Sequence, residues 1–155
     1  MRATFLESLE DRPVGLKPSV KRYMGALDTT EWDNSVDLYG GGGLVSTTGD
    51  LTIFLQALFN GRIFEKEDTL PVMLLKKEYK SLEKELPEQR LGFGAIVGKE
   101  SGVELYTHSG FWGTVFMHHK DYNCSIALNY TNDGDTKVLQ RVIDYIKWLH
   151  DRQNN

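Results

Sequence analysis

The chain has 155 residues and a mass of 17.7 kDa, and 40% of its residues are hydrophobic, 26% charged and 11% aromatic. These figures predict a single globular domain with a core of its own, and they exclude a disordered chain and a disulfide scaffold. Eighteen Lys and Arg residues against 22 Asp and Glu give a net charge of −4, so a nucleic acid is not an expected partner.

Cysteine content and hydropathy exclude further classes. Cys124 is the single cysteine, which excludes an intrachain disulfide and a cysteine-based metal site. No stretch approaches the roughly 18 apolar residues that a membrane span needs, and no apolar signal region follows Met1. The sequence therefore predicts no membrane span and no cofactor, and it leaves the compartment open.

The beginning of the chain is irregular. Residues 1–38 carry turn-forming residues throughout, and only 4–9 are suited to a short helix. So long a stretch with little periodicity is uncommon inside a compact domain, which indicates that it packs against further chain.

A first helix is expected after the glycine run 40–43. Apolar residues then recur at helical spacing, at positions 51, 54, 55 and 58. Ser46 or Thr47 is suited to the N-cap, Asp50 lies in the first turn, and the pair 60–61 ends the helix.

The rest of the chain predicts a second short helix, a sheet and a terminal helix. The short helix is expected at 69–77, before a polar connector that runs to residue 89. Apolar runs bounded by turn residues follow at 91–97, 103–107, 114–118 and 124–130. Residues 135–151 are periodic on one face, as in an amphipathic helix. The predicted fold class is α+β, an antiparallel sheet of about four strands with the C-terminal helix packed on it, preceded by loops and one or two helices.

The glycine run admits two interpretations. Backbone N–H groups beside a helix start can bind phosphate, but a P-loop needs a Lys and a hydroxyl residue after its last glycine, where Leu44 and Val45 stand. No strand precedes the run, as a dinucleotide motif would require. Close backbone packing is therefore favoured.

Histidines raise the question of a metal site. His118 and His119 are adjacent, and adjacent residues on a strand point to opposite faces, so they cannot both ligate one ion with His108 unless the strand bulges. We expect no metal site and one histidine on each face of the strand end. His150 is interpreted as a surface residue near a helix C-terminus.

The segment 107–113, with the sequence THSGFWG, gathers a titratable group, a hydroxyl and aromatic residues where a strand ends. Its glycines allow a substrate backbone to come close. By itself the segment does not distinguish a binding site from a histidine in a hairpin, because His108 and Ser109 point their side chains apart.

Several blocks of the chain follow one another in a specific order. The block 41–51 reads GGGLVSTTGDL, and it is followed by LGFG at 91–94, HSG at 108–110 and an apolar strand at 126–129 before the terminal helix. In this order the chain resembles the C-terminal half of the serine β-lactamase and penicillin-binding protein superfamily. It is most similar to the class C-like group of β-lactamases, D-alanyl-D-alanine carboxypeptidases and esterases. The resemblance covers about residues 1–150 and implies a partial β-lactamase-like fold.

The resemblance also implies roles for four residues. HSG matches the family's Lys-Thr-Gly or His-x-Gly triad, so His108 and Ser109, followed by Gly110, would hold the substrate carboxylate or support the acylation network. The N–H of Phe111 would form one half of an oxyanion hole. His108 is thus the candidate catalytic residue, and all four residues are candidates for substrate binding.

The chain departs from the family at the nucleophile. Family members carry Ser-x-x-Lys and then Tyr-x-Asn before the triad. The match SLEK at 81–84 lies in a charged connector, where solvated lysines stay charged, and the match YTN at 130–132 follows the triad, so we interpret both as accidental. Met1 resembles an internal methionine of the family. We therefore expect residues 1–155 to be the C-terminal part of one domain whose nucleophile-bearing half precedes them.

The leading hypothesis is a fragment of a serine hydrolase that is inactive alone. Its completed form would transfer an acyl group through a serine ester, from a β-lactam, a D-alanyl peptide or an ester. The sequence leaves open whether this chain is an enzyme.

Two alternatives remain open. One is a non-catalytic binding module whose pocket is formed by His108, Ser109, Phe111 and Trp112. The other is an assembly surface anchored by aromatic residues, namely Trp32, Tyr39, Phe111 and Trp112. An exposed sheet also predicts a homo-oligomer. Full-length relatives usually work in the periplasm, attached to a membrane or outside the cell, but nothing in this chain assigns it to such a place.

Overall fold

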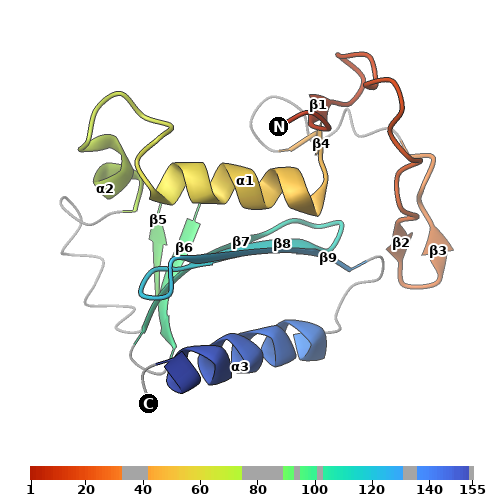
Figure 1. Ribbon diagram of the computed structural model, residues 1–155. Coiled ribbons are helices and arrows are strands. Elements are labelled where there is room, and N and C mark those ends of the chain that lie inside the picture. Colours follow the sequence, from red (N-terminus) through yellow and green to blue (C-terminus); the bar gives the residue numbers. More distant parts are fainter. Residues whose placement is uncertain (33–41, 75–88, 93–94, 101–102, 131–135, 154–155) are drawn as a thin grey trace.

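The computed structural model describes residues 1–32, 42–74, 89–92, 95–100, 103–130 and 136–153 (Figure 1). This part of the chain forms two short antiparallel strand pairs, two helices, a five-stranded sheet and a C-terminal helix. The expected α+β class is therefore confirmed.

The main sheet is an antiparallel meander in the order β5-β6-β7-β8-β9. Its strands are β5 (Gln89–Gly92), β6 (Ala95–Glu100), β7 (Val103–Ser109), β8 (Thr114–His119) and β9 (Cys124–Asn129). About four strands were expected, and the fifth arises because the apolar run 91–97 divides into β5 and β6. Gly92 pairs with Ala95, so the chain reverses inside that run. Its glycines favour such a reversal, but the continuous apolar pattern hides it.

Helices α1 (Thr48–Phe59) and α3 (Thr136–Gln153) lie on opposite faces of this sheet (Figure 1). α1 packs over β8 and β9. The prediction of a C-terminal helix at 135–151 is confirmed, since α3 differs from it by only one or two residues at each end. No helix in the described part of the chain is both long and apolar enough to cross a membrane.

The ends of α1 follow the predicted capping signals. Thr47 is the N-cap, and its hydroxyl accepts a hydrogen bond from the Asp50 N–H at 3.1 Å. Asn60 closes the helix by donating its N–H to the carbonyls of the last turn, and Gly61 follows with φ at +69°. Sequence capping signals thus define both ends of α1.

Helix α2 (Thr69–Met73) is the short second helix, and Leu74 caps it. The remaining positions of the predicted range, 75–77, lie outside the described residues, as does the connector up to residue 88. Residue 89 belongs to β5 instead of the connector.

The expectation of a helix at 4–9 is wrong. Strand β1 (Phe5–Leu6) pairs with β4 (Leu44–Val45), which directly precedes α1. Asp50 holds this arrangement, because one of its carboxylate oxygens accepts hydrogen bonds from the Ala3 N–H at 2.8 Å and from the Thr4 hydroxyl at 2.9 Å. These long-range bonds stabilise an extended backbone that the local sequence does not specify. They also lower the pKa of the Asp50 carboxyl, with the Ala3 N–H as the largest cause.

A second strand pair lies further along the N-terminal segment. β2 (Tyr23–Met24) and β3 (Leu27–Asp28) form a hairpin. The Thr29 N–H and its hydroxyl both bond to the Arg22 carbonyl, at 2.9 and 3.1 Å, and the Thr29 side chain is fully buried. The described part of the irregular segment is therefore held by short local pairings.

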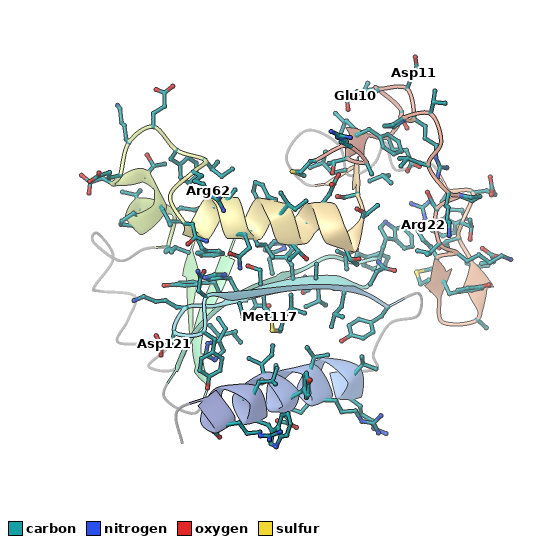
Figure 2. The ribbon with its side chains drawn as sticks, viewed as in Figure 1. Glu10, Asp11, Arg22, Arg62, Met117 and Asp121 are labelled. Carbon is teal, nitrogen blue, oxygen red and sulfur yellow. The ribbon has the colours of Figure 1, made fainter. Side chains whose placement is uncertain are left out.

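Two layers of buried residues lie against the main sheet, one on each face. Leu55 of α1 and Tyr106 of β7 belong to the layer under α1. Met117 of β8 is buried and points from the sheet toward α3 (Figure 2), where Ile143 is buried as well. The alternation of side chains along β7 and β8 therefore decides which residues meet α1 and which meet α3.

Candidate functional site

The end of β7 is fixed by its pairing with β8. His108 lies opposite Phe116 and Ser109 opposite Val115. The ladder ends with a hydrogen bond from the Gly110 N–H to the Thr114 carbonyl at 2.8 Å. Beyond this bond the chain turns, and within the described residues the Phe111 N–H donates no hydrogen bond.

Two glycines of the bend have different roles. Gly113 has φ at +76°, and an added Cβ would lie 2.1 Å from the Tyr130 carbonyl oxygen. The Tyr130 N–H donates a hydrogen bond to the Gly113 carbonyl at 2.8 Å. An added Cβ at Gly110 would meet only the Thr114 carbonyl, at 4.0 Å. Gly113 therefore permits close backbone packing, whereas Gly110 leaves open space beside the strand end.

His108 and Ser109 point to opposite faces of the sheet, as the sequence predicts. The His108 imidazole stacks on the Phe116 ring, with centroids 5.7 Å apart. It shares its face with Tyr106, which stacks on Phe59 of α1, so His108 lies on the α1 side. His108, Ser109 and Gly110 are exposed, and the Phe111 side chain is 72% exposed. The four residues of the expected site therefore form one accessible strand end.

An aromatic cluster borders this strand end. Trp112 packs edge-on against Phe111 at 5.0 Å and against Trp32 at 6.4 Å, measured between ring centroids. The Arg22 guanidinium, labelled in Figure 2, lies 5.2 Å from the Trp112 ring centroid. Arg22 also donates to the Trp32 carbonyl at 3.0 Å. We call Trp32, Phe111, Trp112 and Arg22 the aromatic cluster.

A cavity of about 260 Å³ lies on the α1 side of the same strands. α1 contributes Leu55, Leu58 and Phe59 to its lining, and Phe116 lines it from β8. Because Phe116 also stacks on His108, one aromatic side chain connects the cavity with the expected site.

The two histidines of β8, His118 and His119, are buried and pack against neighbouring side chains. His118 is 3% exposed, stacks on Phe59 at 4.2 Å, and its Nδ1 lies 2.9 Å from the Ser125 hydroxyl. Burial, with a smaller contribution from His119, lowers the pKa of His118 to about 4. His119 stacks on Tyr122 instead. The prediction of one histidine on each face is confirmed.

The described residues contain no group of three or more His, Cys, Asp or Glu side chains that could hold a metal ion. The side chain of His150 lies outside the described residues.

The glycine run is described only at Gly42 and Gly43. Gly43 has φ at +82°, and its carbonyl accepts the Glu7 N–H at 3.0 Å. This contact joins the start of β4 to the segment after β1, which supports the interpretation of close backbone packing at that glycine.

The structure describes only part of the two motif matches that we interpret as accidental. The SLEK match at 81–84 lies outside the described residues, and of the YTN match only Tyr130 lies within them. Tyr39, an anchor of the alternative assembly surface, also lies outside.

Sequence reasoning missed Arg22 and the cavity. Arg22 comes from an irregular segment 90 residues before Trp112, and no local signal links the two. The cavity combines α1, α2 and the sheet, so it depends on tertiary packing. Trp32 and Trp112 are two anchors of the alternative assembly surface, but no local pattern predicts the contact between them.

The comparison with protein-family models gives one match. The family model described as Beta-lactamase matches residues 1–148. No curated protein and no solved structure matches the chain.

Proposed function

Because the chain belongs to the Beta-lactamase family, we propose that it is the C-terminal, substrate-facing part of a serine acyl-transfer site. The observation that carries the proposal is the accessible end of β7. There His108 and Ser109 are exposed, and the Phe111 N–H lies just beyond the last ladder bond. In the proposed arrangement, a nucleophilic serine from outside this chain lies beside this strand end.

In the proposed reaction, a serine outside this chain attacks the substrate carbonyl. The N–H of Phe111 donates a hydrogen bond to the oxyanion that develops. His108 and Ser109 bind the substrate carboxylate or support proton transfer in acylation. The leaving group departs with a proton, and water then hydrolyses the serine ester. The substrate is a β-lactam, a D-alanyl peptide or an ester.

The backbone around Phe111 supports this role. The Tyr130 N–H donates to the Gly113 carbonyl at 2.8 Å, and the Asn129 amide donates to the Thr114 hydroxyl at 2.9 Å. These bonds fix both sides of the bend before any substrate binds. A preorganised donor stabilises a developing charge without reorganising during the reaction.

The proposal assigns the missing nucleophile to a preceding half of the same domain, so the 155-residue chain is inactive alone. The test is intact-mass analysis of the purified chain after treatment with a fluorescent penicillin and with a fluorophosphonate. We expect no covalent adduct. An adduct on a serine of this chain would place the nucleophile here and contradict the proposal.

A fused protein completes the test. The chain is joined to the segment encoded directly upstream of Met1, and acylation is measured again. We expect an adduct on a serine of the added segment, and slower acylation after His108→Ala. If the fused protein folds and neither probe reacts, the hydrolase proposal is wrong.

The aromatic cluster favours a second candidate, a non-catalytic binding module. Phe111 and Trp112 extend the strand end with accessible ring surface, and exposed aromatic side chains are common in binding sites. This candidate predicts that ligands bind at the end of β7 while the fused protein is never acylated.

The expected homo-oligomer also remains a proposal. β9 lies at the edge of the sheet in the described residues, and its sequence, CSIALN, carries neither a charge nor a proline. Such an edge lacks two of the usual protections against pairing with another strand, a charged side chain and a proline. Sedimentation velocity at rising concentration should detect a dimer, and a monomer at every concentration would contradict the proposal.

A further inference from the structure

The cavity under α1 has the properties of a binding site for an uncharged group. It has a volume of about 260 Å³ and lies between α1, α2 and the sheet. The described residues of its lining are apolar or aromatic with one exception, Thr107. The Thr107 hydroxyl donates to the Phe116 carbonyl at 3.1 Å, so it presents no unmet hydrogen bond to the space. A charged or strongly polar group would lose its hydration there without compensation.

The size of the cavity indicates the size of its occupant. An apolar cavity of about 150 Å³ in a protein interior stays dry and binds benzene. The cavity here is larger, so it has room for a bicyclic ring or a short branched alkyl chain. Leu55 and Leu58 form a buried part of the lining, whereas Ile63 is 43% exposed. The lining therefore runs from the core to a surface that a ligand can reach.

The position of the cavity links it to the end of β7. Thr107 precedes His108 in the strand, and Phe116 both lines the cavity and stacks on the His108 imidazole at 5.7 Å. A ring packed against Phe116 would place its polar substituent within reach of His108, on the same face of the sheet. The cavity and this strand end are then two parts of one site.

From this arrangement we propose that the cavity is an apolar subsite for the substrate, and that the substrate is an ester carrying an aryl group or short alkyl chain. The inference rests on the proposed function, and it narrows the substrate classes left open there. The methyl groups of a D-alanyl peptide would leave most of the cavity empty, whereas an aryl ester fills it and keeps its carbonyl outside, near His108.

The proposal can be tested on the 155-residue chain, because binding needs no nucleophile. The probe is 2-acetonaphthone, an unreactive ketone with a bicyclic ring and one carbonyl. We expect saturable binding to one site by equilibrium dialysis. NMR should show shifts of the methyl signals of Leu55, Leu58 and Met73 together with the ring signals of His108.

Two isoleucines provide a matched pair of variants. Ile63 lines the cavity, whereas Ile53 lies on α1, is 57% exposed and is not part of the lining. Ile63→Trp fills the space and should weaken binding by at least about tenfold, while Ile53→Trp should change it less than about twofold. If Ile63→Trp does not fold, Met73→Phe fills the cavity from α2 and carries the same expectation.

Three results would overturn the proposal: no saturable binding, equal effects of the two tryptophan variants, or occupancy of the cavity with no change at His108. Failure of this experiment overturns only the apolar subsite. Failure of acylation in the fused protein overturns the hydrolase function, and it does so whether or not the probe binds.

Discussion

Two histidines on the same face of neighbouring strands have opposite surroundings. His118 of β8 is buried under α1, stacks on Phe59 and bonds to Ser125. His108 of β7 is exposed, and its ring stacks on Phe116. The pairing register places both on the α1 side, so the difference comes from what covers each end. One end of the strand pair is therefore buried under α1, and the other is exposed.

The largest loss of stability is expected from a substitution in the bend after His108. Gly113→Ala puts a Cβ 2.1 Å from the Tyr130 carbonyl oxygen in a backbone with φ at +76°. We expect a loss of about 3 kcal/mol in the free energy of unfolding, measured by urea denaturation. Gly110→Ala is the matched control and should cost less than about 0.5 kcal/mol. Equal losses would show that the exposed end is not held by the Gly113–Tyr130 contact.

The buried histidine makes stability depend on pH. Its pKa is about 4 in the folded chain against 6.5 for an unperturbed histidine. Between these values the unfolded chain binds a proton that the folded chain does not. The contribution of His118 to the free energy of unfolding is therefore fully present above pH 6.5. It is lost as the pH drops to 4, by up to about 3 kcal/mol.

This pH dependence is measured by denaturation between pH 7 and pH 4. Carboxyl groups titrate near the lower limit, so the comparison is between the unaltered chain and His118→Gln. The variant should lose less stability over that range. Identical slopes would contradict the assignment to His118.

Removing a hydrogen-bond partner of His118 should cause a smaller loss of stability. The Ser125 hydroxyl lies 2.9 Å from His118 Nδ1 and accepts the Gln56 side-chain N–H at 3.0 Å. Ser125→Ala should cost about 1–2 kcal/mol, because it leaves a buried ring nitrogen without this partner. Ser109→Ala at the exposed end is the matched control and should change stability by less than about 0.5 kcal/mol. A reversed order in thermal denaturation would contradict the division into a buried and an exposed end.

The smallest effect on stability is expected at the proposed site itself. His108→Ala removes an exposed ring that contacts Phe116, and the free energy of unfolding should change by less than about 0.5 kcal/mol. Ligand responses at the strand end should nevertheless disappear, as NMR titration would show. A large loss of stability with ligand binding intact would assign His108 a purely structural role.

The sequence predicted those parts of the fold that depend on local patterns. The capping signals at Thr47 and residues 60–61 define α1, and periodicity defines α3 and three of the strands. Two-residue strands such as β1 carry no usable period, and long-range bonds to Asp50 hold that segment. The split of the run 91–97 was missed because apolar residues continue through the hairpin.

At the candidate site, too, the sequence predicted the local features and not the long-range contacts. The sequence predicted that the segment THSGFWG lies where a strand ends, and strand alternation predicted that His108 and Ser109 point apart. The Arg22–Trp112 contact and the cavity depend on residues far apart in the chain. The burial of His118 under Phe59 is likewise a tertiary contact, which no local pattern around His118 predicts.

The central claim is that the exposed end of β7 faces the substrate. Its most direct test is an NMR titration of the 155-residue chain with phenyl acetate, an ester that carries a carbonyl and an aryl group. We predict saturable shifts of the Phe111 amide and the His108 ring, lost in His108→Ala and retained in Ser125→Ala. Shifts located elsewhere, or unchanged in His108→Ala, would contradict the claim.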